Sequence, residues 1–274
     1  SGPEWTGEEP AGKHILVHAE QGLGDAIQFA RFLPLLADRG AKVHFAAHTA
    51  LVELFIGTFD GVIESVSSAT DALPRYDYHI PLLSLPHRID PRLESLKKHS
   101  EPYLKLSNDG GSLLPPKQEK LDIGIVWAGN PHHTNDVNRS CNLADLRPLF
   151  ELNDIRWISL QVGPRAAEIA ANNLPIINLS GELTDFAITA AMVSQLDYVI
   201  SVDTSVLHIA GALGISTCAL IPFEPDWRWM LQRSDSPWYP SIRLYRQTQI
   251  NDWSQAVETI KQDIRVHRDS LPPH

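Results

Sequence analysis

Short apolar runs typical of β-strands alternate along this chain with segments of helical periodicity. In the first part, the candidate strands are 14–18, 42–47, 61–66 and 77–82, and the candidate helices are 25–39 and 49–59. Strands that alternate with helices in this way predict a mainly parallel sheet covered by helices on both faces. Pro34 lacks a backbone N–H, so we expect it to bend or shorten the first helix.

The alternation stops at SNDGGSLLPPKQEK (107–120), whose Gly, Pro, Ser and charged residues are typical of a linker. It then resumes, with candidate strands at 121–127, 155–161, 175–180, 198–203, 216–222 and 242–247 and candidate helices at 143–152, 165–173, 185–196, 205–213 and 253–268. We predict an α/β protein with two doubly wound, Rossmann-like domains, 1–118 and 119–274, facing a central cleft. The final helix is a candidate to cross back to the first domain. Ligands bind at the carboxyl ends of the strands in such sheets.

Size and charge limit the classes of function. The chain has 274 residues, 43% of them hydrophobic, which is enough for a large buried core. Its net charge of −10 argues against a nucleic-acid or anionic-membrane surface, because both need clustered Lys and Arg. A local basic pocket for a small anion remains compatible with that charge.

The cysteines and termini indicate a compartment. Cys141 and Cys218 are far apart and form no CxxC pair, so we expect neither a disulfide framework nor a zinc site. The N-terminal SGPEWTGEEP is polar and acidic, unlike a signal peptide. The most apolar segment, 206–222, is too short and interrupted to span a bilayer. These features predict a cytoplasmic, soluble chain.

The segment YVISVDTSVLHIAGALG places three capping residues between a strand and a helix. We expect Asp203 to cap the helix, leaving N–H groups and hydroxyls near Thr204 and Ser205 to bind a diphosphate. His208, one turn inside, would lie within reach of that anion. The alternative has similar weight: a capped, buried helix with a core histidine.

The loop WAGNPHHTNDVNRSCNL (127–143) is unusually long and polar for a strand-to-helix connection. Asn130 and Arg139 are candidate donor-binding residues, since the arginine fork could neutralise a diphosphate. Gln161, at the end of the next strand, is a further candidate. His132 and His133 suggest a metal, but adjacent side chains rarely converge, so we expect no metal site.

An aromatic loop, IPFEPDWRWMLQRSDSPWYP (221–240), follows the fifth strand of the second domain. Trp227 is a candidate to stack on a base or sugar. For two of the three tryptophans, we expect instead that they cover the end of the sheet and pack between the domains.

The loop HAEQGLGDAIQF in the first domain lacks the GxGxxG spacing of a dinucleotide site. Gly22 and Gly24 would let the backbone approach a ligand or a partner domain. Asp25 at the start of the helix is either a helix cap or a group that does chemistry. Gln21 and Gln28 are candidate neighbours on the acceptor side.

Taken together, the PEWTGE entry and the four segments from HAEQGLGDAIQFARFLPLL to DWRWMLQRSDSPWYP resemble a known family. The chain resembles the GT-B enzymes of the ADP-heptose:lipopolysaccharide heptosyltransferase family, glycosyltransferase family 9. It is most similar to the branch found at the C-terminal end of bacterial tetratricopeptide-repeat proteins. The resemblance covers residues 3–265.

This resemblance implies an inverting, metal-independent transfer of a sugar from a nucleotide-diphosphate sugar, without a cofactor. Asp25 would be the general base, and Asp203, Thr204 and His208 would hold the donor. The lysine that heptosyltransferases carry in the second domain's first loop is missing, and Arg139 is its chemical substitute. The acceptor would be a hydroxyl of a glycan or of a protein such as flagellin, recruited by a preceding repeat domain. A non-catalytic nucleotide-sugar or partner-binding module and a nucleotide-sugar 2-epimerase are the alternatives.

Overall fold

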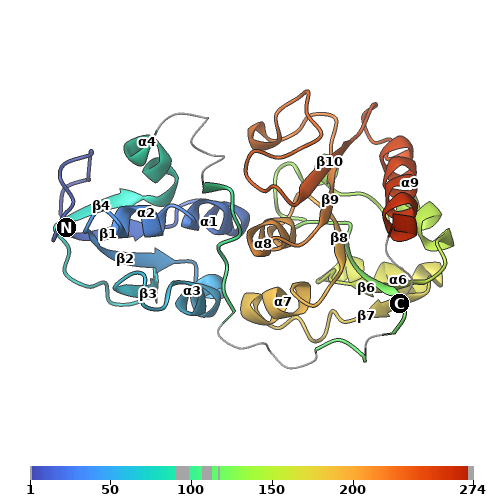
Figure 1. Ribbon diagram of the computed structural model, residues 1–274, viewed down its shortest axis with the longest axis horizontal. Coiled ribbons are helices and arrows are strands. Elements are labelled where there is room, and N and C mark those ends of the chain that lie inside the picture. The colour runs from blue at the N-terminus through green and yellow to red at the C-terminus, as the bar shows by residue number, and fades with distance from the viewer. Residues whose placement is uncertain (1, 91–98, 107–112, 117, 271–274) are drawn as a thin grey trace.

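A computed structural model describes residues 2–90, 99–106, 113–116 and 118–270. Its strands form two parallel sheets (Figure 1), a four-stranded sheet of order β3-β2-β1-β4 and a six-stranded sheet of order β10-β9-β8-β5-β6-β7. Every strand pair in both sheets is parallel. The predicted α/β class with two doubly wound units is confirmed.

The first sheet lies in the blue-to-cyan part of Figure 1. Its strands are β1 (His14–His18), β2 (Lys42–Ala47), β3 (Ser65–Ser68) and β4 (Tyr78–Pro81). The helices around it are α1 (Leu23–Ala30), α2 (Leu33–Ala37), η1 (Thr49–Leu51), α3 (Val52–Phe59), η2 (Leu82–Ser84) and α4 (Leu85–Ile89).

The second sheet follows residue 120. Its strands are β5 (Leu121–Val126), β6 (Ile155–Ser159), β7 (Ile176–Asn178), β8 (Tyr198–Val202), β9 (Thr217–Ile221) and β10 (Ile242–Arg246). The helices are α5 (Asp136–Arg139), η4 (Leu143–Glu151), η5 (Pro164–Ala167), α6 (Glu168–Asn172), α7 (Phe186–Val193), α8 (Ser205–Leu213), η6 (Trp227–Trp229) and α9 (Ser254–Ser270).

One sequence prediction about the helices and strands is confirmed, and two need correction. The first helix is split into α1 and α2, with Pro34 in the first turn of α2, as its missing N–H led us to expect. The segment 143–152 is a 3₁₀-helix rather than an α-helix, and Pro148 inside it removes a donor of the α-helical ladder. The strand predicted at 61–66 begins later, at Ser65.

The final helix does not cross back to the first domain. Trp253, Val257 and Ile260 pack in one core cluster with residues of η4 and with Tyr245 of β10, all from the second domain. Helix α9 therefore closes the outer face of the second sheet (Figure 1). Half of the predicted linker 107–120 (residues 107–112 and 117) lies outside the described residues, and the domain boundary at 118 stays a prediction.

The two domains meet along α1 and α8, which lie side by side between the sheets (Figure 1). One core cluster contains Ile27 and Phe29 of α1 together with Leu207 of α8 and Tyr239. Gly24 permits this approach, because a Cβ there would lie 2.8 Å from Cδ2 of His208. The close packing brings the first turns of both helices to one place.

Candidate functional site

The site lies near the topological switch point of each sheet, where the order of the strands reverses while the strands stay parallel. In the first sheet α1 follows the central strand β1, and in the second α8 follows β8, which pairs with β5. Doubly wound sheets bind ligands at such points, at the carboxyl ends of their strands. Because α1 and α8 pack against each other, the regions of both domains where a ligand is expected lie next to each other.

The Asp25 carboxylate caps its own helix and also contacts the second domain. Its Oδ2 accepts a hydrogen bond from the backbone N–H of Gly22 at 3.0 Å, which caps α1. Its Oδ1 pairs with Nη2 of Arg228, a residue of the second domain, at 2.5 Å. The carboxylate thus holds its own helix and also faces across the domain interface.

Arg228 is the centre of this arrangement and was not among the predicted site residues. Its Nε pairs with Asp226 at 2.7 Å, and its Nη1 donates to Oε1 of Gln28 at 2.9 Å. Burial alone would lower the pKa of Arg228. The nearby carboxylates of Asp25, Asp226 and Asp203 outweigh that effect, so the pKa is raised overall and the group stays cationic. The only sequence signal was its place between two tryptophans, two residues after Asp226.

His208 is buried and neutral. Its Nδ1 lies 3.0 Å from the hydroxyl of Tyr239, its Nε2 lies 3.4 Å from Nη1 of Arg228, and its ring stacks on Trp229. Burial, and then the charge of Arg228, hold the pKa of His208 well below its usual range. The side chain is thus a neutral hydrogen-bonding group rather than a cation.

Asp203 is not the cap of α8, which corrects the sequence prediction. Thr204 is the N-cap residue, and within the described part of the chain no side chain caps this helix. The Thr204 hydroxyl lies 3.2 Å from that of Ser201, while the Asp203 carboxylate lies 3.8 Å from Nε2 of His208. The Leu207 N–H donates to the backbone oxygen of Thr204 at 3.1 Å, while the N–H groups of Ser205 and Val206 have no side-chain cap among the described residues and could bond an external acceptor.

The environment of Asp203 changes its acidity. Burial raises the pKa of this carboxyl, and the positive charges of Arg228 and Arg139 offset only part of that rise. The side chain is still 16% exposed. It is therefore a partly desolvated acceptor beside two arginines, able to bond a ligand hydroxyl.

Arg139 lies beside Asp203, just before the start of α8. Its Nη1 donates to the backbone oxygen of Asp203 at 3.0 Å, and its Nε pairs with Asp136 at 3.1 Å. Gly129 makes this possible, since a Cβ there would lie 2.4 Å from Nη2 of Arg139. Asn130 is exposed on the same loop, where its Oδ1 accepts the N–H of His132.

Gln161 holds the loop after β5 through hydrogen bonds from its side-chain amide to the backbone. Its Oε1 accepts the N–H groups of Trp127 and Ala128, and its Nε2 donates to the backbone oxygens of Ala128 and Val162. The side chain is buried and its amide is fully engaged. Its effect on a ligand would therefore pass through the shape of the loop after β5.

The aromatic loop divides as the sequence suggested. Trp229 and Trp238 are buried, and Trp238 packs on Phe29 of α1, so both belong to the packing between the domains. Trp227 is 62% exposed next to Arg228. It remains free to stack on a planar or sugar group.

The remaining candidates lie on the first domain's side. Gln21 and Gly22 are exposed at the mouth of the site, and Gln28 is buried beneath it as a partner of Arg228. Among the described residues, Nε2 of Gln28 has no hydrogen-bond partner. Arg31, also buried, donates to the backbone oxygen of Trp238 at 2.5 Å and fastens α1 to the second domain.

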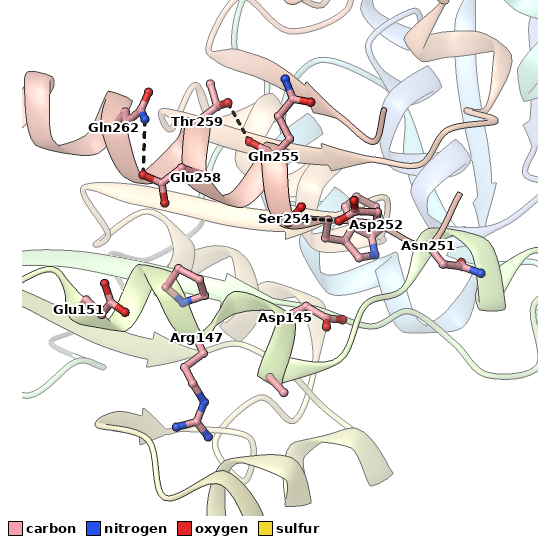
Figure 2. A pocket seen from close by; sticks show the side chains of 13 residues that line it. Asp145, Arg147, Glu151, Asn251, Asp252, Ser254, Gln255, Glu258, Thr259 and Gln262 are labelled. Carbon is pink, nitrogen blue, oxygen red and sulfur yellow. Dashed lines mark hydrogen bonds between the residues drawn. The ribbon is translucent and has the colours of Figure 1, made fainter. Parts of the chain in front are cut away.

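A groove of about 940 Å³ lies between η4 and α9, within the second domain. Figure 2 shows polar side chains that largely bond to one another, such as Gln262 to Glu258 and Thr259 to the backbone of Gln255. Its charged lining includes Asp145, Glu151, Asp252 and Glu258 with Arg147. This excess of acids makes the groove unsuitable for a diphosphate.

Three further observations concern metal ions, the cysteine thiols and membrane-spanning helices. Within the described ranges, no group of three His, Cys, Asp or Glu side chains is placed to hold a metal ion. Burial raises the pKa of Cys218 to about 12 and also raises that of Cys141, so neither thiol is poised to react at neutral pH. In the searched part of the chain, no helix has the length and apolar character needed to cross a bilayer.

Comparison with known proteins gives the fold a family context. No family model matches the chain. The curated protein FlbA of Caulobacter vibrioides is 22% identical over 96% of this chain. The chain spans about half of that relative, 48% of its length.

Solved structures are similar over most of the chain. Heptosyltransferase II of E. coli, an ADP-heptose lipopolysaccharide enzyme, matches with a TM-score of 0.62 at 14% identity, covering 94% of this chain and all of that one. E. coli heptosyltransferase WaaC, solved with ADP, matches with a TM-score of 0.61 at 13% identity over 92% and 99% of the two chains. The iron-containing glycosyltransferase TibC of E. coli matches at 0.57 and 10% identity over 90% and 66%. The chain therefore has the GT-B fold of glycosyltransferase family 9 structures.

Proposed function

We propose that this chain is an inverting, metal-independent glycosyltransferase domain that moves a sugar from a nucleotide-diphosphate sugar to a hydroxyl of a protein or glycan. One observation carries the proposal: Asp25 of the first domain faces the uncapped N-terminus of α8, with Arg139 and Arg228 beside it. A carboxylate opposite an anion site is the arrangement that inversion requires. The shared fold with heptosyltransferases supports this assignment.

The reaction follows from these positions. Asp25 takes the proton of the acceptor hydroxyl while that oxygen forms a bond to the anomeric carbon of the sugar. The bond from that carbon to the diphosphate breaks, and its electron pair leaves on the phosphate oxygen. The N–H groups of α8 and the guanidinium of Arg139 stabilise the growing negative charge.

Individual side chains suggest how the donor is held. Asp203 bonds a hydroxyl of the ribose or sugar, Thr204 and Ser205 bond the diphosphate, and exposed Trp227 stacks on the base or sugar. ADP is the first nucleotide to test, because WaaC was solved with it. The acceptor enters past Gln21 and Gly22, and the part of the protein beyond this chain recruits it.

A non-catalytic nucleotide-sugar-binding module is the second candidate. It is favoured by the engagement of both Asp25 oxygens, one with the Gly22 N–H and one with Arg228. The two candidates share a donor site and differ only in turnover.

One experiment tests both. The purified chain is screened by thermal unfolding with ADP, UDP, GDP and their sugar conjugates. A ligand at a hundred times its Kd is expected to stabilise the fold by about 2.7 kcal/mol. The stabilising donor is then assayed for hydrolysis and transfer, in EDTA and with Mg²⁺, Mn²⁺ or Fe²⁺. No stabilisation by any nucleotide refutes the donor site, stabilisation without turnover selects the binding module, and turnover only with metal refutes the metal-free mechanism.

A further inference from the structure

Arg228 connects the two domains through opposite charges. It belongs to η6 of the second domain, yet it pairs with Asp25 at 2.5 Å and bonds Gln28 at 2.9 Å, both on α1. Asp226, two residues before it, holds its Nε at 2.7 Å. The guanidinium is thus tethered on its own domain and shared with the other.

The same guanidinium borders the proposed diphosphate site. Its Nη1 lies 3.4 Å from Nε2 of His208, which lies 3.8 Å from the carboxylate of Asp203. Its side chain is only 10% exposed, so its charge is poorly screened by water. A diphosphate at the N-terminus of α8 would lie close to Arg228. It carries more negative charge than a single carboxylate and would therefore attract the guanidinium more strongly.

The pair with Arg228 also limits Asp25. One carboxylate oxygen accepts the Gly22 N–H and the other accepts Arg228, so an acceptor hydroxyl would have to share an oxygen with one of these donors in the arrangement described. In that arrangement, an acceptor hydroxyl competes with Arg228 for the Asp25 carboxylate, and the competition ends when Arg228 has another partner.

We propose that Arg228 is a further ligand of the donor diphosphate and that it changes partner, leaving Asp25 for the diphosphate when the donor binds. This inference rests on the proposed function and deepens it. The exchange exposes Asp25 to an acceptor hydroxyl only after the donor is in place. Asp226 keeps the guanidinium at the site during the exchange.

A double-mutant cycle on nucleotide affinity tests the exchange. Kd is measured by calorimetry for whichever of ADP, UDP and GDP binds the wild-type chain, in wild type, Asp25→Asn, Arg228→Gln and the double variant. Asp25→Asn removes the competitor for Arg228 and is expected to tighten binding by about fivefold, a coupling in the range measured for contacting charges. Arg228→Gln is expected to weaken binding by about tenfold, the size typical of a lost hydrogen bond to a charged group.

The double variant separates exchange from simple repulsion. If Asp25 only repels the nucleotide, Asp25→Asn tightens binding equally in the Arg228→Gln background, and the proposal is overturned. If the partners exchange, the effect of Asp25→Asn disappears there. Should Arg228→Gln fail to fold by thermal unfolding, Arg228→Lys replaces it, because a lysine cannot bond Asp25 and Asp226 at once with its compact head. The effect of Asp25→Asn is then expected to fall below about twofold.

The outcomes also distinguish the two proposals. Nucleotide binding that Asp25→Asn leaves unchanged overturns the exchange and leaves the proposed function standing. Failure of ADP, UDP and GDP to bind the wild-type chain overturns the proposed function, and the exchange with it.

Discussion

The turns before α1 and α8 are alike in sequence, each running from a strand to a helix with an aspartate at the junction, but the two aspartates have different surroundings. Asp25 lies inside its helix, caps it through Gly22 and pairs with an arginine of the other domain. Asp203 precedes its helix without capping it and is desolvated enough that its pKa rises. Position in a strand–helix turn therefore does not define a carboxylate's role, and its partners do.

The proposed function gives the two groups different roles. Under that proposal, Asp25 takes the proton of the acceptor hydroxyl. Asp203, which lies near Arg139, Arg228 and His208, would hold the anionic donor. Substitutions at the two positions should thus affect different kinetic constants.

The largest effect is expected from Asp25→Ala. Loss of a positioned base should lower kcat by about 10²- to 10⁴-fold, while donor affinity does not fall. Turnover of the stabilising donor is measured at saturation. Glu53→Gln is the matched control, because Glu53 is also a first-turn acid, on α3, and is exposed. Undiminished turnover in Asp25→Ala would leave Asp25 as a helix cap alone.

Asp203→Asn should act on binding instead. A hydrogen bond to a charged group contributes about 1.5–3 kcal/mol, so kcat/KM should fall by about 10- to 100-fold through KM. Because the substitution removes a partly buried charge without changing shape, the unfolding free energy should not decrease. Steady-state kinetics and urea unfolding check the two parts. A fall in kcat with KM unchanged would contradict this division between the two aspartates.

Gly24→Ala tests the packing that brings the two turns together. The added Cβ would lie 2.8 Å from Cδ2 of His208, and such overpacking costs roughly 1–3 kcal/mol. Alanine regains up to about 1 kcal/mol of helix propensity in α1. The net loss of unfolding free energy should be about 1–2 kcal/mol, measured in urea. Gly181→Ala, where nothing lies within 4 Å of the added Cβ, should be nearly neutral. Equal stability of both variants would mean that α1 and α8 are not closely packed.

Local features of this comparison could be read from the sequence. β1 and β2 occur at the predicted residues, because their apolar runs are buried on both faces. The junctions at Asp25 and Asp203 also lie at helix starts. These features depend on neighbouring residues, which a single sequence presents directly.

Features that depend on how the domains face one another could not be read. Arg228 and Asp25 form an ion pair although about two hundred residues separate them in the sequence. No local sequence pattern around either residue predicts this pair. Gln161 was predicted to bind the donor, but its amide bonds the backbone of the loop after β5. Burial likewise decides that His208 is neutral, and burial follows from packing on Tyr239 and Trp229.

The smallest expected effect concerns pH, and it contrasts His208 with Asp203. Burial lowers the pKa of His208 below the 6.5 of an unfolded histidine, so the unfolded chain binds the proton more readily. Its contribution to stability is full above pH 6.5 and is lost as the pH falls, by up to about 1.4 kcal/mol per pH unit. His18 and His44, whose pKa values burial also lowers, act in the same direction. The raised pKa of Asp203 acts oppositely, at pH values above the 3.8 of an unfolded aspartate. Urea unfolding between pH 7.5 and 5 should therefore show falling stability, with a shallower slope in His208→Gln and an unchanged slope in the control His132→Gln, an exposed histidine. Equal slopes in wild type and His208→Gln would mean that His208 is not buried between the domains.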